Sequence, residues 1–386
     1  MESTTPAGQA AALMRDFAKT TGLDPPSLQP RRYLWTDAFA VCNYLGLSGL
    51  TGDQAFRDRA LRLIGQVHHV LGRFRSGDAR TGWISGLVQE EGEEHPVAGG
   101  LRIGKSLPER RPGEPYDERL EWDRDGQYYH YLTRWMHALS RAGTVTGDPQ
   151  YIRQAVELAR AAHAGFTTRS GGRMTMHWKM STDLSRPLVP SMGQHDPLDG
   201  LVTYTGLRLA AEENGMGPVL GQEIDDMARL TRSIPLATED PLGIGGLLAD
   251  AGRIVQLAER GVVLDPALPG TIVASALDGL GLFTRSRALE MPAPYRLAFR
   301  ELGLAIGLAG AGRMLAAIDE NPDLFRDAPW LVRGGGELRE YLPVRDAIVA
   351  FWLDPENRTP DTWTEHRDIN TVMLATSLVP DGFLGI

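Results

Sequence analysis

Two stretches of the chain repeat one pattern: residues 51–71 read TGDQAFRDRALRLIGQVHHVL, and residues 146–166 read TGDPQYIRQAVELARAAHAGF, at an offset of 95 residues. In both, Thr-Gly-Asp precedes an amphipathic segment. Glycine often ends a helix and aspartate often caps the next one, so each Thr-Gly-Asp predicts the turn of a helical hairpin. The matched pairs are Phe56 with Tyr151, Ala60 with Ala155, His68 with His163 and Trp83 with Trp178. A shared register of this kind indicates a repeat architecture, and the alternative is chance similarity between Ala-, Leu- and Arg-rich helices.

Apolar residues recur at helical spacing along most of the chain, which predicts an all-α protein. The expected helices are 7–20, 30–48, 53–74, 126–145, 149–166, 197–214, 218–233, 242–260, 267–284, 296–318, 337–353 and 366–379. One stretch alternates instead: RMTMHWKM, residues 173–180, predicts a strand with Met174, Met176, Trp178 and Met180 on one face. Long loops are expected over 75–122 and 167–196, and loops of this length in a compact protein are often functional.

The composition excludes several classes of partner. Hydrophobic residues make up 42% and charged residues 23% of the chain, which is ordinary for a globular protein. The net charge is −9 and Lys and Arg are scattered, so we expect no nucleic acid. Cys42 is the only cysteine, and no H-E-x-x-H spacing occurs, so we expect no disulfide within the chain, no metal and no cofactor. Lys105 lies in RIGKSLPERR, which lacks the phosphate-loop pattern. Neither a signal peptide nor a run approaching about 18 apolar residues is evident, which predicts a cytoplasmic protein without a membrane partner.

Six hairpins with short turns at one end and long loops at the other close most simply into a double ring of inner and outer helices. In this respect the chain resembles the six-hairpin glycosidases, the (α/α)6 toroid shared by glycoside hydrolases, unsaturated uronyl hydrolases and the N-acylglucosamine 2-epimerase group. The resemblance covers nearly the whole chain and lies in architecture and motif placement. It implies one toroid domain spanning residues 1–386 and a small saccharide as substrate. We also expect a monomer or homodimer.

If the helix expected at 30–48 is the first inner one, the inner helices begin near residues 30, 126, 197, 242, 296 and 366, and carboxylates lie at five of these six starts. Helix capping explains any one of them, but it does not explain the tryptophans and histidines beside them. The catalytic candidates are Asp37, Asp125, His195, Asp196 and His366. The candidates for substrate binding are Trp35, Asp123, Tyr128, Trp178, Asp199, Glu365 and Asp368. The alternative is that each aromatic ring is a core residue and each histidine is a structural hydrogen-bonding group.

The stretch EWDRDGQYYHY, residues 121–131, crowds carboxylates and rings together, and we expect it to form the rim and wall of the site. Asp125 is its expected proton donor or base, paired with Asp37 or Asp196, and Tyr128 is its expected sugar-facing ring. Asp37 should lie deeper in the ring, where it either meets an Arg or His or works chemically. If Asp125 has a catalytic role, D125N should change stability by no more than about 1 kcal/mol.

Three functions fit these residues. The first is a glycoside hydrolase acting on a small saccharide through two carboxyl groups. The second is a sugar epimerase or isomerase, in which His195 and His366 move a proton at a carbon beside a carbonyl. The third is a sugar-binding protein without catalysis.

Overall fold

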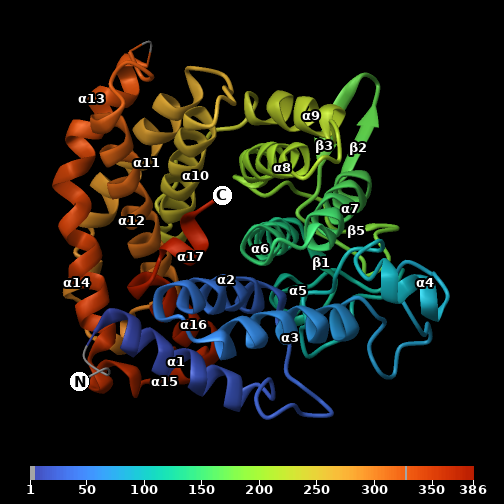
Figure 1. Ribbon diagram of the computed structural model, residues 1–386. Helices are drawn as coiled ribbons and strands as arrows, with labels where there is room; N and C mark the ends of the chain where they lie inside the picture. Colours follow the sequence, from blue (N-terminus) through green and yellow to red (C-terminus); the bar gives the residue numbers. More distant parts are fainter. Residues whose placement is uncertain (1–4, 327) are drawn as a thin grey trace. The chain divides into compact units, whose positions relative to one another are not determined.

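The computed structural model describes residues 5–326 and 328–386 (Figure 1). The chain is all-α apart from short strands, and each of the twelve expected segments contains a helix. These helices are α1 (Pro6–Thr20), α2 (Leu34–Thr51), α3 (Gln54–Leu71), α6 (Tyr129–Thr146), α7 (Pro149–Phe166), α8 (Asp196–Glu213), α9 (Gly221–Thr231), α10 (Pro241–Glu259), α11 (Leu268–Arg285), α12 (Ala298–Glu320), α14 (Leu342–Leu353) and α16 (Arg367–Leu378). Shorter helices not expected from the sequence are α4 (Gln89–Glu94), α5 (Glu118–Asp123), α13 (Pro329–Leu338), α15 (Asp361–Thr364) and α17 (Asp381–Leu384).

The chain forms two compact units. Unit 1 contains the described residues up to Phe17, Gly46–Asp53 and Pro235–Ile386, and unit 2 contains Ala18–Leu45 and Gln54–Ile234. In unit 2, α6 packs on α7 and α8, and α8 packs on α9. In unit 1, α10 packs on α11 and α12, and α12 packs on α14 and α16. The closure of all six hairpins into one ring, and one domain spanning residues 1–386, stay predictions.

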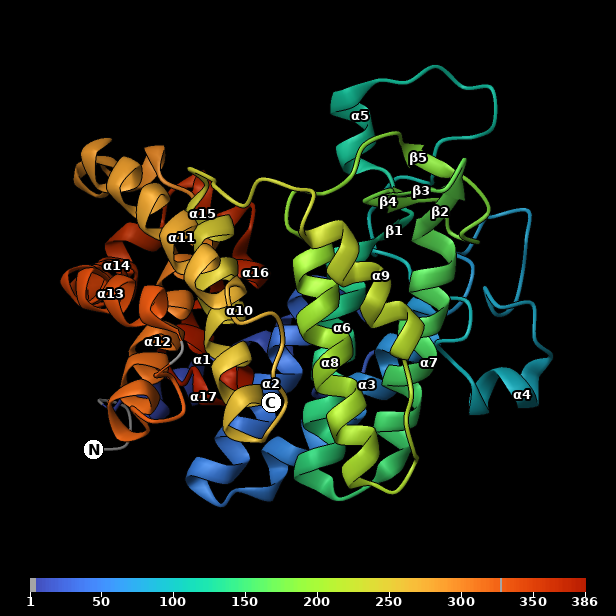
Figure 2. The ribbon, with the colours of Figure 1, turned by 90° about the horizontal axis from the view of Figure 1, so that it is seen from above.

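Unit 2 is built around α6 and α8. Figure 2 shows α6, α7, α8 and α9 side by side, with the strands gathered toward one end of them. Trp135 on α6 is completely buried and donates its indole N–H to Nε2 of His68 on α3 at 3.1 Å. Burial lowers the pKa of His68 to about 3, so a neutral imidazole accepts this hydrogen bond.

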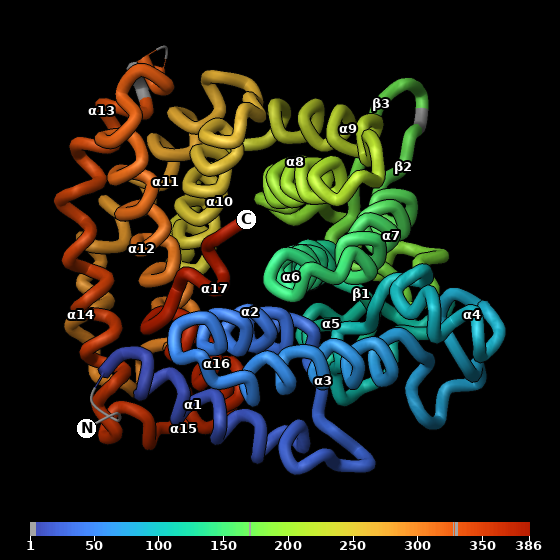
Figure 3. The backbone as a smooth tube through the Cα atoms, in the orientation of Figure 1, coloured from blue at the N-terminus to red at the C-terminus, as the bar shows by residue number. Residues whose placement is uncertain are grey.

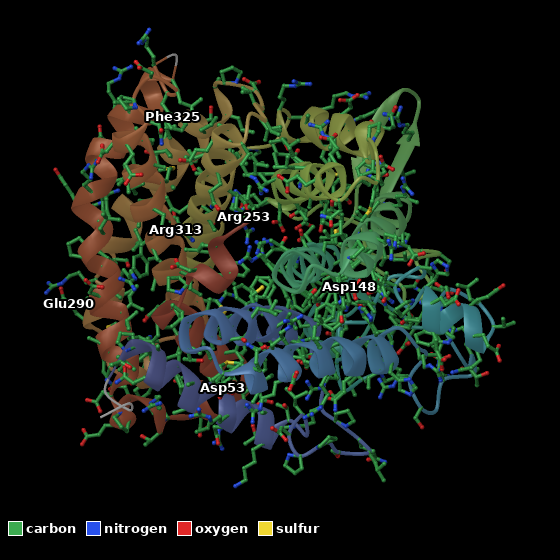
Figure 4. All side chains as sticks on the ribbon, viewed as in Figure 1. Asp53, Asp148, Arg253, Glu290, Arg313 and Phe325 are labelled. Atoms are coloured by element: carbon green, nitrogen blue, oxygen red, sulfur yellow. The ribbon has the colours of Figure 1, made fainter. Side chains whose placement is uncertain are left out.

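The two Thr-Gly-Asp turns have the same local structure. Gly52 and Gly147 have φ of 73° and 71°, in the left-handed region that favours glycine. The hydroxyl of Thr51 donates to the carbonyl of Leu47 at 2.7 Å, and that of Thr146 donates to the carbonyl of Ala142 at 2.6 Å. The Asp148 carboxylate, labelled in Figure 4, caps α7 by accepting the N–H of Gln150. The predicted hairpin turns are confirmed.

The single strand predicted over 173–180 is wrong. Strand β3 (Arg173–Met176) pairs with β2 (Thr167–Ser170), whereas β4 (Lys179–Met180) pairs with β1 (Gln127–Tyr128) and β5 (Pro187–Val189). Between β3 and β4, Trp178 makes backbone hydrogen bonds to Tyr129 and Ser191 instead. The alternation of apolar and polar residues over 173–180 therefore does not mark one strand, because the chain passes from one sheet to the other between β3 and β4.

Unit 1 is built around α10 and α12 (Figure 3). These two helices lie close together because glycines of one face glycines of the other. A Cβ on Gly307 would collide with the backbone of Gly245, and one on Gly245 would collide with the backbone of Gly303. Helix α12 is long and apolar enough to cross a membrane, with a mean hydropathy of 1.4 over its best window, but 72% of that window is buried inside the protein. This is the burial expected of a core helix.

Candidate functional site

The stretch at residues 121–131 does not form one helix start. Helix α5 ends at Asp123, β1 follows, and α6 begins at Tyr129. The change from extended to helical backbone sends neighbouring rings in different directions. Tyr129 is buried against Tyr204, to which its hydroxyl donates at 2.8 Å, while the hydroxyl of Tyr131 lies 2.6 Å from that of Tyr33.

His130 lies among three rings. Tyr128 stacks on it with ring centroids 5.6 Å apart and planes at 11°, and Tyr131 and Trp35 meet it edge-on at 4.8 and 5.9 Å. Desolvation by this packing lowers the pKa of His130 to about 4, so the imidazole is neutral at pH 7. Its side chain is still 32% exposed, so a small molecule can reach it.

Asp196 faces His130 from the first turn of α8. The two approach to 3.7 Å between His130 Nδ1 and Asp196 Oδ1, which is longer than a direct hydrogen bond. Asp196 is 5% exposed. Burial is the main cause that raises its pKa to about 8; the negative charge of Asp199 adds to the rise, and Arg134 opposes it. At pH 7 this carboxyl group is therefore mostly protonated.

Asp199 lies one turn further along α8 and has the opposite environment. One of its oxygens accepts from Arg134 at 2.6 Å and the other from the Thr133 hydroxyl at 2.5 Å. Residues three apart lie on the same face of a helix, so α8 presents a buried carboxyl group with a raised pKa and an arginine-paired carboxylate together. Such a difference between neighbouring carboxyl groups is typical of acid–base sites.

Three buried polar atoms around His130 have no hydrogen-bond partner among the residues that the structure describes. They are Nε1 of Trp35, the hydroxyl of Tyr128 and Oδ2 of Asp196, in side chains of residues no more than 7% exposed. Buried polar atoms are nearly always paired, so the side chains around His130 hold unused hydrogen-bonding capacity. Because the three atoms have almost no exposed surface, a ligand could bond to them only if these side chains moved.

Asp37 and Asp125 both lie in closed ion pairs. Asp37 is 3.2 Å from Arg32 and also accepts the N–H of Tyr33. Asp125 is 2.5 Å from Arg102 and accepts the N–H of Gly104. Both carboxylates are 1% exposed. For Asp37 this is the arginine partner that the sequence allowed as one alternative. For neither residue does the arrangement favour the proton-transfer role predicted from the sequence, since each buried carboxylate is already bonded to an arginine and to a backbone N–H.

The predicted substrate-binding residues of unit 2 differ in how far their side chains are exposed. Tyr128 is 2% exposed and is covered on one face by Trp178 and on the other by His130, so a sugar cannot stack on it as predicted. Trp35 is buried, Trp178 is half-buried, and Asp123 is exposed at the end of α5. His195 precedes α8, half-buried, and its side chain makes no capping hydrogen bond.

His366, Glu365 and Asp368 belong to unit 1. His366 and Glu365 are exposed just before α16, and Asp368 is half-buried in the first turn of α16. The His366 ring meets Phe299 edge-on with ring centroids 5.6 Å apart. Since His195 belongs to unit 2, a shared proton-transfer site of these two histidines stays a prediction.

The prediction from sequence missed His130, Thr133 and Arg134. Their spacing places them on successive turns of one helix face, which was a usable signal for a site on α6. A surface hollow of about 270 Å³ in unit 1, lined by Asp278, Arg285, Glu337 and neighbouring residues, has exposed charges and is a weaker candidate. Among the described residues, no three His, Cys, Asp or Glu side chains are grouped so that they could hold a metal ion.

No protein-family model matches this chain, and no curated protein matches its sequence. Among solved structures, it is similar to cellobiose 2-epimerase from Spirochaeta thermophila, with 12% identity, a TM-score of 0.49, and coverage of 97% of this chain and 96% of that one. It is also similar to a D-mannose isomerase, with 12% identity, a TM-score of 0.45 and 87% of each chain covered. An unsaturated glucuronyl hydrolase specific for heparin has 13% identity and a TM-score of 0.34, over 71% of this chain and 82% of that one.

Proposed function

We propose that this protein is a carbohydrate-active enzyme in which Asp196 and His130 transfer protons. The observation that carries the proposal is the pair itself, a buried carboxyl group whose pKa is raised to about 8 beside an imidazole whose pKa is lowered to about 4. At neutral pH this pair holds one proton donor and one proton acceptor. General acids and bases work best when they hold the correct proton at the operating pH.

A saccharide fits the surroundings of this pair. The half-buried rings of His130 and Tyr131 provide apolar contact, and the imidazole of His130 offers a ring nitrogen to a hydroxyl group. The resemblance to the six-hairpin glycosidases implies the same class of substrate.

Hydrolysis of a glycosidic bond is the first reaction that the site fits. Asp196 would give its proton to the leaving oxygen, and the Asp199 carboxylate, paired with Arg134, would favour the positive charge that develops on the sugar ring. A water molecule would then bond to the sugar carbon that lost the leaving oxygen and return a proton to Asp196. In this assignment the two carboxyl groups are both on α8, and Asp37 and Asp125 support the fold through their arginines.

Epimerisation or isomerisation is the second reaction, and the neutral imidazole of His130 favours it specifically. A neutral imidazole can remove a proton from a carbon beside a carbonyl, and protonated Asp196 can return one. The pair His195 and His366 is a further candidate for the same chemistry. A sugar-binding protein without catalysis is the remaining alternative.

One experiment separates these functions. The protein is incubated in D₂O with a panel of monosaccharides, disaccharides and aryl glycosides, and the products are followed by NMR. Hydrolysis gives new reducing ends or free aglycone, whereas epimerisation or isomerisation exchanges a carbon-bound hydrogen for deuterium. Binding without either change supports the non-catalytic alternative. A D196N protein that turns over at the wild-type rate contradicts the proposal.

A cytoplasmic location and a monomeric or homodimeric state are part of the proposal. Cell fractionation tests the location, and light scattering tests the oligomeric state.

A further inference from the structure

A row of aromatic rings leads from the exposed side chain of Trp122 to His130. Trp122 lies against Trp178 with centroids 5.4 Å apart and planes at 45°. Trp178 stacks on Tyr128 at 5.0 Å and 20°, and Tyr128 stacks on His130 at 5.6 Å and 11°. The row is therefore continuous, and one of its ends is the imidazole of the proposed acid–base pair.

The middle of the row is held firmly. The Trp178 indole N–H donates to the hydroxyl of Ser191 at 3.0 Å, its backbone N–H donates to the carbonyl of Ser191 at 3.1 Å, and its carbonyl accepts the N–H of Tyr129 at 3.1 Å. Tyr129 is the first residue of α6, which carries His130, and Ser191 lies five residues before Asp196. Trp178 is thus tied to both segments that supply the acid–base pair.

The outer end of the row is open. Trp122 is 54% exposed, although it is the largest apolar side chain of the short helix α5. Single exposed apolar residues are common and need no special reason. Here the exposed ring differs because it continues a row that is otherwise buried or half-buried and that ends at the site. Asp123, the next residue, is also exposed and offers carboxylate oxygens to hydroxyl groups.

We infer that the exposed ring of Trp122, supported from behind by Trp178, is a second saccharide-binding subsite, so that the ligand is an oligosaccharide whose reacting unit lies at His130 and Asp196 and whose next units lie against Trp122. The inference rests on the proposed function and adds the size of the substrate to it. A pyranose ring presents C–H groups on its faces, which pack on an aromatic ring, while its hydroxyl groups remain hydrogen-bonded at the edge. The ionised carboxylate of a protein is a suitable acceptor for them.

Binding as a function of ligand length tests this subsite. Glucose, mannose and galactose, and the β-1,4- and α-1,4-linked di- and tetrasaccharides of glucose, mannose and galactose, are titrated into the D196N protein by calorimetry. W122A and W122F in the same background are compared with it. We expect an oligosaccharide to bind at least tenfold more tightly than its own monosaccharide. W122A should lose roughly three- to tenfold of that gain, the size of one aromatic contact, while W122F keeps most of it. Monosaccharide affinity should be equal in all three proteins.

The subsite is overturned by an oligosaccharide that binds no better than its monosaccharide, or by a W122A protein that keeps the full gain with length. Equal loss of monosaccharide and oligosaccharide binding in W122A also contradicts it, because the ring would then support the fold. Failure of the proposed function would give a result that can be distinguished from failure of the subsite. In that case wild type and D196N show the same turnover, or no turnover, while the dependence on length still decides the subsite. If no saccharide binds at all, both proposals are wrong.

Discussion

Nδ1 of His130 lies 3.7 Å from Oδ1 of Asp196, and the surroundings of the two groups shift their pKa values in opposite directions, to about 4 for the imidazole and about 8 for the carboxyl group. Packing against rings is the main cause for the imidazole, and burial at the start of α8 is the main cause for the carboxyl group. The pair is therefore neutral over most of the pH range between the two values.

The rate should depend on pH through this pair. We expect kcat/KM to fall below about pH 4, where His130 gains a proton, and above about pH 8, where Asp196 loses one. D196N should lower kcat by about 10²–10⁴-fold, as the loss of a general acid does, and remove the alkaline limb of what activity remains. A pH–rate profile from pH 3.5 to 9.5 measures both. An unchanged alkaline limb in D196N would show that another group titrates there.

Stability should depend on pH in a way that identifies Asp196. Its folded pKa is raised from 3.8 to about 8, so the folded protein binds this proton more tightly than the unfolded chain does, and its contribution is lost as pH rises through 8. His130 and His68 have lowered folded pKa values, so their contributions are lost as pH falls below 6.5. Of Asp196, His130 and His68, only Asp196 changes its contribution to the free energy of unfolding between about pH 6.5 and 8.

We therefore expect the free energy of unfolding of the wild type to fall by up to about 1.4 kcal/mol per pH unit in this window. D196N has no proton to lose and should show a smaller fall. Urea unfolding at pH 6.5, 7.25 and 8 measures the difference between the two proteins. Parallel curves across the three pH values would mean that the carboxyl group is ionised throughout.

Gly193 should be required for the position of Asp196. A Cβ at Gly193 would collide with both oxygens and the carboxyl carbon of Asp196, whereas one at Gly206, on α8, meets nothing within 4 Å. G193A should therefore displace the carboxyl group, lower kcat/KM roughly 10- to 100-fold, and move the alkaline limb to lower pH as the group becomes more exposed. G206A serves as the matched control and should leave both unchanged. If G193A keeps the wild-type profile, the carboxyl group is not held where the structure places it.

The sequence predicted the helices well because their signals are local. Apolar spacing, the glycines at 52 and 147 and the cap at Asp148 act within one or two turns, and the structure contains all of them. The short helices α4 and α5 were missed because six residues are too few to show a period.

The chemistry of the site was harder to predict because it depends on burial and on distant partners. Asp125 and Arg102 are separated by 23 residues in sequence, so their ion pair could not be recognised before the fold was known. Asp196 was a candidate on motif grounds, but the cause of its raised pKa is burial, which no local pattern shows. His130 was part of the quoted stretch, but that stretch was interpreted through its carboxylates and tyrosines.

D125N should reduce stability much more than the limit of about 1 kcal/mol expected from capping alone. The substitution leaves Arg102, with a side chain 8% exposed, without its ionised partner at 2.5 Å. Removing one member of a buried ion pair typically costs about 3–5 kcal/mol. The control is D381N, because Asp381 and Arg313 are 70% and 44% exposed and such pairs contribute little. Urea unfolding of the three proteins gives the two differences. A D125N protein as stable as D381N, with its activity lost, would return Asp125 to the catalytic role predicted from the sequence.

The contact between α10 and α12 allows a test of packing with two alanine substitutions in one helix. A Cβ at Gly307 would collide with Cα and the carbonyl group of Gly245, and neither backbone can move without separating the two helices. A Cβ at Gly312, one turn further along α12, meets nothing within 4 Å. We expect G307A to lower the free energy of unfolding by about 1–3 kcal/mol, as overpacking of a core does. G312A should raise it by up to about 1 kcal/mol, because alanine favours helix more than glycine does. Urea midpoints of the two proteins should thus move in opposite directions from the wild type, and a G307A midpoint at or above that of the wild type would show that the two helices do not pack this closely.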